Sequence, residues 1–394
     1  MKIIQSYERF IPAIGGAETY IANLVENMQD TDFEIVTYLL PDTQENETYS
    51  KNCTILRIKP VVEIPKTRLG VGKEILKDII RARRVNTYLK KSSADIIHIH
   101  APSMLSWLFW LDKKIFWSLL LSRPLLYKKF KKPVVLTIHQ LYYQSYEIPF
   151  ENDRFRHKIF RKIIDVSDAI IAVENYSYDY LNSYLKKHNI KKKLYKIHNS
   201  VNTKIFAFKH NKIRKKLKLL YVGRITSEKG IDFLIDFIKK MPDYIEFNIV
   251  GSGPKEDLNL FKEIMTKNVN VLLHKNISFK NLVNLYQNCN LVLNPVKFQA
   301  ITRVTLEAMS CGRPVIMISR GNRYPVIHGK TGYLIEEDID SLLNLINKVN
   351  KNRKQLIEFG KNARKIIEQE FSNEVIIPKI KKVYEDSIKN GKKV

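Results

Sequence analysis

Short apolar runs alternate with amphipathic segments along most of the chain. Eight runs have the length and composition of buried β-strands, at residues 33–40, 96–99, 134–138, 169–173, 219–222, 247–250, 290–293 and 315–318. Between these runs, apolar residues recur every three to four positions, which is typical of helices that bury one face. This alternation predicts an α/β fold built on parallel sheets with helices on both faces.

A change in charge marks the border between two such α/β units. Residues 186–218 contain thirteen Lys and Arg residues and no Asp or Glu. We therefore predict a first domain over residues 1–204 and a second over residues 205–372. Residues 373–394 carry apolar positions at helical spacing and are expected to form a terminal helix. A chain of 394 residues is long enough for this arrangement.

Composition and charge limit the classes of protein to which this chain can belong and the ligands that it can bind. Hydrophobic residues make up 44% of the chain and charged residues 27%, which is typical of a globular protein. The 67 Lys and Arg against 40 Asp and Glu give a net charge of +27, which favours nucleic acid, anionic lipid or phosphorylated substrates. Because Lys, Ile and Asn are frequent throughout, a general compositional bias explains part of this charge.

Cysteine content and hydropathy indicate the cellular compartment in which the protein works. Cys53, Cys289 and Cys311 are too few and too scattered for a disulfide framework or a zinc site, which favours a reducing compartment. The chain begins without a basic and apolar signal pattern, and no run reaches the roughly 18 apolar residues of a membrane span. We expect a cytoplasmic protein.

The segment at residues 103–132 differs from the rest of the first domain. Charged residues interrupt its apolar runs, and it holds all three tryptophans of the chain, Trp107, Trp110 and Trp117. The basic residues Lys128 and Lys129 follow them. This composition favours a helix that lies in the headgroup plane of an anionic membrane. A buried helix of the first domain, or an oligomer contact, is the alternative.

Two glycine-containing turns carry candidate ligand-binding groups. Gly15 and Gly16 lie between a short strand and an amphipathic helix, where the backbone N–H groups of the helix N-terminus can bind an anion. Arg224 and Lys229 flank the turn after a buried strand, and ligands bind at that end of a parallel sheet. Two cations placed there suit a diphosphate. A surface pairing with Glu228 is the alternative.

A third segment joins polar groups to the start of a helix. Gln299 and Glu307 are eight positions apart, which can place the first on a loop and the second about one turn into a helix. Both side chains could then face one cleft. The backbone N–H groups near Arg303 and Val304 could receive a phosphate at the N-terminus of that helix.

Taken in order, these segments resemble the family 4 glycosyltransferases of group 1 type, which have the GT-B fold. The matching segments are residues 15–18 (GGAE), 95–100 (DIIHIH), 137–139 (TIH), 199–202 (NSVN), 223–230 (GRITSEKG), 251–254 (GSGP), 299–307 (QAITRVTLE) and 329–332 (GKTG). Each match is short, but their order along nearly the whole chain is specific to the family.

The resemblance implies two Rossmann-like doubly wound domains that face each other across a cleft, with the terminal helix returning to the first domain. A nucleotide-sugar donor would bind the second domain and an acceptor the first, and transfer would retain the configuration at the anomeric carbon. No metal or other cofactor is implied. Together with the basic and Trp-rich features, the resemblance favours a lipid-linked or glycan acceptor and a peripheral position on the inner face of the membrane.

The same resemblance implies roles for individual residues. Arg224 and Lys229 would stabilise the diphosphate as negative charge develops on it. Glu307 would hold the ribose hydroxyls, and His139 would lie near the transferred sugar unless it is a strand-end histidine bonded to backbone. Further donor contacts are implied for Gly15, Gly16, Gly223, Asn276, Arg303 and Val304.

One position departs from the family pattern. Gln299 stands where the family usually has a glutamate that contacts hydroxyls of the donor sugar, so hydrogen bonding is kept and the charge is lost. This favours either altered donor specificity or a catalytically weakened partner subunit. A nucleotide-sugar epimerase and a nucleic-acid binder are further alternatives. The epimerase would need no acceptor, and the sequence motifs of a nucleic-acid binder are not found.

Overall fold

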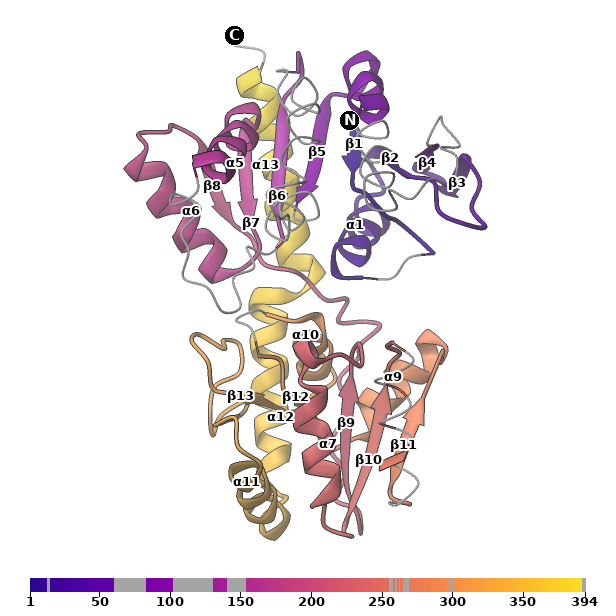
Figure 1. Ribbon diagram of the computed structural model, residues 1–394, viewed down its shortest axis with the longest axis vertical. Helices are drawn as coiled ribbons and strands as arrows, with labels where there is room; N and C mark the ends of the chain where they lie inside the picture. The colour runs from indigo at the N-terminus through magenta and orange to yellow at the C-terminus, as the bar shows by residue number, and fades with distance from the viewer. Residues whose placement is uncertain are drawn as a thin grey trace, which may run out of the picture. The chain divides into compact units, whose positions relative to one another are not determined.

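The chain folds into two compact units (Figure 1). The first is Met1–His198 together with Ile377–Val394, and the second is Asn199–Ile376. The computed structural model describes residues 1–12, 15–59, 83–101, 130–139, 154–254, 269–297 and 301–391, and also residues 258, 261, 263 and 264.

The observed borders of the units differ by a few residues from those placed at 204–205 and 372–373 by the sequence. Backbone pairing within the second unit accounts for the difference. The Val201 N–H donates to the Phe371 carbonyl, and the Asn373 N–H donates to the Val201 carbonyl. These bonds tie the residues on either side of Val201 to the second unit.

The first unit is built on an eight-stranded sheet in the order β3-β4-β2-β1-β5-β6-β7-β8. Neighbouring strands are parallel except for β3 and β4 at one edge. The strands are β1 (Lys2–Ser6), β2 (Asp32–Tyr38), β3 (Asn46–Ser50), β4 (Cys53–Ile58), β5 (Ile96–Ala101), β6 (Val134–Ile138), β7 (Ala169–Ala172) and β8 (Lys193–Lys196). The helices are α1 (Gly16–Asn27), α5 (Arg154–Val166), α6 (Asn175–Lys187) and α13 (Asn373–Gly391), and residues 83–91 are also helical.

The core of the first unit follows from the composition of its elements. Strands β6 (VVLTI) and β7 (AIIA) are buried along their whole length, as expected for parallel strands covered on both faces. Helix α1 buries an apolar stripe that includes Leu24 and Val25. The terminal helix α13 buries Ile380, Val383 and Tyr384. The predicted α/β class is confirmed.

The second unit is built on a six-stranded parallel sheet in the order β11-β10-β9-β12-β13-β14. Its strands are β9 (Leu217–Val222), β10 (Ile245–Val250), β11 (Val271–His274), β12 (Leu291–Asn294), β13 (Val315–Ile318) and β14 (Gly332–Ile335). Its helices are α7 (Ile231–Lys239), α9 (Phe279–Asn288), α10 (Arg303–Ser310), α11 (Ile339–Lys351) and α12 (Gln355–Ile366), with the short 3₁₀ helix η2 (Ser227–Lys229) and the π-helix η3 (Ile367–Phe371).

The order of these strands defines where a ligand can bind. From β9 the chain first adds β10 and β11 on one side and then β12, β13 and β14 on the other. Strands β9 and β12 are neighbours, with Leu219 paired to Leu291. In open parallel sheets such a switch point leaves a crevice outside the carboxyl ends of the two strands.

Two predictions concern the membrane: that no segment spans it, and that the Trp-rich segment docks on it. Within the described parts of the chain, no helix has the length and apolar character needed to cross a bilayer. The docking residues Trp107, Trp110, Trp117, Lys128 and Lys129 lie outside the described residues. Their role in binding a membrane therefore stays a prediction.

Candidate active site

The turn that carries Arg224 is fixed by close backbone packing with the loop after β10. The Gly223 N–H donates to the Val250 carbonyl at 3.0 Å. A Cβ atom on Gly251 would overlap the carbonyl oxygen of Gly223, and one on Gly253 would overlap that of Ile225. Only glycine at positions 251 and 253 allows these loops to lie so close. Arg224 itself is exposed at the carboxyl end of β9.

Lys229 lies at the end of η2, and the residue after it sets the position of this turn. Gly230 has a φ of 81°, in the left-handed region, and a Cβ atom there would overlap the carbonyl oxygen of Pro295. Pro295 follows β12 directly. The turn after β9 therefore lies against the end of β12, at the switch point of the sheet.

Replacing Gly230 with alanine is expected to lower the free energy of unfolding of the second unit by about 2 kcal/mol, since the change adds a side chain in the left-handed region and a steric clash. Gly329→Ala is the matched control. Gly329 has a φ of 70° but, in the part of the chain that the structure describes, no atom within 4 Å of its would-be Cβ. The control should cost about 1 kcal/mol from backbone strain alone. Urea unfolding of both variants measures the difference. Equal losses would contradict the close packing against Pro295.

Helix α10 begins with a network of hydroxyl and amide groups at the end of β12. Thr302 is the N-cap, and its hydroxyl accepts from the Thr305 N–H at 3.3 Å. The Asn294 side-chain amide donates to the hydroxyls of Thr302 at 2.8 Å and Thr305 at 3.0 Å. The N-terminus of α10, with Arg303 and Val304, is thereby held at the carboxyl end of β12.

Glu307 is a buried carboxylate that two neighbours hold in place. The Tyr286 hydroxyl donates to its Oε2 at 3.0 Å, and the Arg303 guanidinium donates to its Oε1 at 3.2 Å. Burial raises the pKa of Glu307, and the positive charge of Arg303 opposes that shift. Each carboxylate oxygen keeps a second lone pair, so Glu307 can still accept hydrogen bonds from hydroxyls of a ligand.

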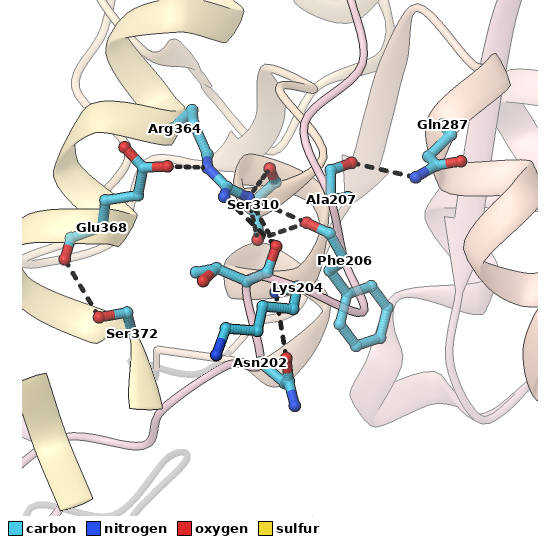
Figure 2. Close-up of polar contacts among 10 residues, drawn as sticks. Asn202, Lys204, Phe206, Ala207, Gln287, Ser310, Arg364, Glu368 and Ser372 are labelled. Atoms are coloured by element: carbon cyan, nitrogen blue, oxygen red, sulfur yellow. Dashed lines mark hydrogen bonds and ion pairs between the residues drawn. The ribbon is translucent and has the colours of Figure 1, made fainter. Parts of the chain in front are cut away.

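The opposite end of α10 is held by Arg364 of α12 (Figure 2). Its Nη1 donates to the carbonyls of Ser310 at 2.8 Å, Phe206 at 3.0 Å and Thr203 at 3.2 Å, and its Nε donates to Oε1 of Glu368 at 2.6 Å. A guanidinium at the C-terminus of a helix satisfies carbonyls that lack intrahelical partners. Arg364 thus joins the segment entering the second unit to the helix that carries Glu307.

Arg364 and Tyr286 lie in no motif of the sequence that marks a ligand site. The ring of Tyr286 packs edge-on against Phe206, with 5.8 Å between the ring centroids. The same Phe206 offers its carbonyl to Arg364. These contacts join segments about 80 to 160 residues apart, as between Phe206 and Arg364 at 158 residues. Local sequence patterns hold no signal for such pairs.

In the first unit, Gly15 and Gly16 lie at the start of α1. Gly15 is the N-cap in an extended conformation, and as a glycine it has no side chain that could cap this end of the helix. The carboxylate of Glu18 lies so close that a Cβ atom on Gly15 would overlap it. Burial raises the pKa of Glu18, and Arg9 at 3.8 Å opposes that shift.

His139 follows β6 in the first unit and is partly exposed. Its Nε2 lies 3.0 Å from Nδ1 of His100, a residue of β5. The rings of Tyr20 and His139 pack edge-on, with 4.9 Å between their centroids. Although part of its surface is exposed, the imidazole is surrounded by enough protein that desolvation lowers the pKa of His139 to about 3, so it is neutral.

The structure groups the expected site residues by unit. At the switch point of the second unit, Gly223, Arg224 and Lys229 follow β9, while Arg303, Val304 and Glu307 belong to α10 after β12. Asn276 lies after β11 with a φ of 50° and is exposed. Gly15, Gly16 and His139 belong to the first unit. Gln299 lies outside the described residues, so its expected role stays a prediction.

Comparison with known proteins gives the class of protein to which these features belong. The family model for glycosyl transferases group 1 matches residues 202–366, and that for glycosyltransferase family 4 matches residues 14–205. The chain belongs to the family 4 glycosyltransferases of group 1 type. The resemblance seen in the sequence, and with it the assignment as a glycosyltransferase enzyme, is confirmed.

Individual proteins resemble the chain along nearly its whole length. The chain is 28% identical over 386 residues to an uncharacterized glycosyltransferase of Methanocaldococcus jannaschii. The aligned region covers 96% of each chain. Sucrose-phosphate synthase from Thermosynechococcus elongatus superposes with a TM-score of 0.76 at 21% identity over 98% of both chains. Anabaena HepE in complex with UDP-glucose gives a TM-score of 0.63 at 16% identity over 99% of this chain and 100% of that one. The predicted GT-B fold is confirmed.

Proposed function

We propose that this glycosyltransferase moves a sugar from a nucleotide-sugar donor to a lipid-linked or membrane glycan, with retention at the anomeric carbon. One observation carries the proposal. A turn with two cations, Arg224 and Lys229, packs against the end of the strand that leads to the buried carboxylate Glu307. A nucleoside diphosphate presents the complementary groups, which are phosphate oxygens and ribose hydroxyls. The UDP-glucose bound in Anabaena HepE supports a donor of this class.

The chemistry of the proposed site follows from the charges of its residues. The bond to the sugar breaks as negative charge develops on the diphosphate, and Arg224 and Lys229 would stabilise that charge. The N–H groups at the N-terminus of α10, near Arg303 and Val304, would bind phosphate oxygens. Glu307 would accept hydrogen bonds from the ribose hydroxyls. Since side chains and backbone supply the positive charge, we propose that transfer needs no metal.

Charge supports an acceptor at a membrane surface. The net charge of +27 favours contact with anionic lipid. Part of it lies on exposed side chains at the end of α6 and along the edge strand β8, namely Lys186, Lys187, Lys191, Lys193 and Lys196. We propose that the protein works in the cytoplasm as a peripheral protein on the inner face of the membrane, with the Trp-rich segment adding to its attachment.

A panel of UDP-, GDP- and ADP-sugars, each with and without anionic vesicles containing a lipid extract, tests the proposal. We expect nucleoside diphosphate release from one donor, stimulation by the lipid extract, and no effect of EDTA. NMR of the product then gives the anomeric configuration, which retention requires to match the donor. Inversion of configuration, or loss of activity in EDTA, would contradict the corresponding part of the proposal.

The substitution at Gln299 favours a second candidate, a partner subunit that binds a donor and does not turn it over. Calorimetric binding of UDP, GDP or ADP without release from any matching donor would support that candidate. Release that depends on one donor would exclude it.

A further inference from the structure

Six side chains of the first unit form a continuous chain of hydrogen bonds, called here the histidine chain. In order, its members are His139, His100, Gln5, Tyr384, His98 and Thr137. They come from strands β1, β5 and β6, the residue after β6, and helix α13. Gln5 pairs in register with His98, and His100 with Thr137, so these side chains share one face of the sheet.

Gln5 sets the direction in which the hydrogen bonds of the histidine chain run from donor to acceptor, because one of its two polar atoms is an oxygen and the other is a nitrogen. Its Oε1 lies 2.6 Å from Nε2 of His100, and its Nε2 lies 3.3 Å from the Tyr384 hydroxyl. A carboxamide oxygen carries no hydrogen and can only accept, whereas a carboxamide NH2 can only donate. The carboxamide therefore accepts from His100 and donates to Tyr384.

This direction determines which nitrogen of each imidazole carries its hydrogen. His100 donates from Nε2 to Gln5, so in its neutral form its Nδ1 is an acceptor. The neighbour of that Nδ1, at 3.0 Å, is Nε2 of His139, which must then be the donor. A neutral imidazole has one hydrogen on nitrogen, so Nδ1 of His139 carries a lone pair. Burial keeps all three imidazoles neutral by lowering their pKa values.

The other half of the histidine chain agrees with this direction. Tyr384 accepts from Gln5 and donates its own hydrogen to Nδ1 of His98 at 2.7 Å. His98 then donates from Nε2 to the Thr137 hydroxyl at 2.7 Å. Each of the five bonds thus pairs one donor with one acceptor, and no imidazole needs a second hydrogen.

We propose that Gln5, acting through His100, holds His139 in the tautomer protonated on Nε2, so that His139 presents an unprotonated Nδ1 to a hydroxyl of the substrate. Among the described residues, no hydrogen bond involves this Nδ1. Gln5 and His100 act as positioning residues, because they affect the ligand only through His139. The inference deepens the proposed function and rests on it for the identity of the ligand.

The tautomer restricts what His139 can bind. An unprotonated nitrogen accepts a hydrogen bond from a hydroxyl or an amide N–H. Phosphate and carboxylate oxygens offer only lone pairs at neutral pH, so they would face an uncompensated acceptor. His139 therefore suits a hydroxyl of the sugar or of the acceptor, and it does not suit a phosphate oxygen.

The tautomer of His139 can be measured directly in the full chain. Long-range proton–nitrogen correlation spectra of protein labelled at histidine distinguish protonated from unprotonated ring nitrogens, and His139→Gln assigns the signal among the nine histidines. We expect Nε2 of His139 to carry the hydrogen in the wild-type protein. A hydrogen on Nδ1 would overturn the inference. This measurement needs no substrate and no altered network.

Gln5→Met tests the part played by Gln5, because it keeps most of the volume and removes both polar atoms. We expect His139 to become a mixture of tautomers and kcat/KM for sugar transfer to fall about tenfold, with the dissociation constant of UDP, GDP or ADP unchanged. The control is Tyr195→Phe, which removes a hydroxyl from β8 of the same unit outside the histidine chain and should leave both readouts unchanged. An unchanged tautomer in Gln5→Met would overturn the role of Gln5.

These readouts separate the inference from the proposed function. If no donor is turned over, the proposed function fails while the tautomer in the wild-type spectrum still decides the inference. If transfer proceeds normally but Nδ1 of His139 carries the hydrogen, the proposed function stands and the inference fails.

Discussion

Replacing both Arg224 and Lys229 with alanine should lower donor turnover by about 10³-fold or more, because each cation opposes charge that develops as the diphosphate departs. The loss should appear mainly in kcat, since the developing charge exists only on the way to the transition state. Initial rates of nucleoside diphosphate release, measured with the donor found in the panel, give both kinetic constants. The variant should fold normally, because Arg224 is exposed and Lys229 is partly exposed.

The control for this variant removes the same charge from the same unit. Lys239→Ala with Lys240→Ala changes two exposed cations at the far end of α7, where they pair with Asp236 and Asp340. Exposed pairs contribute little to stability. We expect the control to keep near wild-type turnover. If the two double variants lose activity equally, the loss reflects the net charge of the unit, and the assignment of Arg224 and Lys229 to the diphosphate is wrong.

The sequence predicts the central strands of both sheets far better than the edge strands. Runs such as 134–138 and 315–318 coincide with β6 and β13, because strands buried on both faces must be apolar along their length. Strands β3 (NETYS) and β8 (KLYK) lie at the two edges of the first sheet and escaped prediction. Edge strands face solvent and carry polar or charged residues, so they lack the apolar pattern that marks a strand.

In the candidate site as well, residues in short sequence motifs could be predicted, whereas contacts between residues far apart in the sequence could not. Arg224, Lys229 and Glu307 could be found because each lies in a short motif beside a strand end or a helix start. The bond between Gln5 and Tyr384 joins residues 379 positions apart, and it exists only because α13 packs on the first unit. Distances of this kind are set by the tertiary fold, and no local pattern in the sequence marks them.

Acidification from pH 7 to pH 5.5 should lower the free energy of unfolding of the first unit by about 3–4 kcal/mol through the three imidazoles of the histidine chain. Burial lowers the pKa of His98 and of His139 to about 3 and that of His100 well below its ordinary value. In the unfolded chain each histidine takes up a proton near pH 6.5, while in the folded unit it stays neutral.

The sign follows from the protons bound in each state. Between about pH 6.5 and pH 3 the unfolded chain binds protons that the folded unit does not, so stability rises with pH across this window. The full contribution is present above pH 6.5 and is lost as the pH falls. Glu18 acts in the opposite sense, because burial raises its pKa and the folded unit takes up that proton first. It can offset at most one of the three protons.

Urea unfolding at several pH values between 7 and 5.5 measures this dependence, with hydrogen exchange of the amides of β5 and β6 reporting on the first unit. His100→Gln should reduce the slope of stability against pH by about one third, since it removes one of three titrating imidazoles. His328→Gln, in the second unit, is the matched control and should leave the slope unchanged. A slope that is the same in wild type and His100→Gln would mean that His100 takes up a proton as readily in the folded protein as in the unfolded chain. The direction assigned to the histidine chain would then fail as well, because it requires neutral imidazoles.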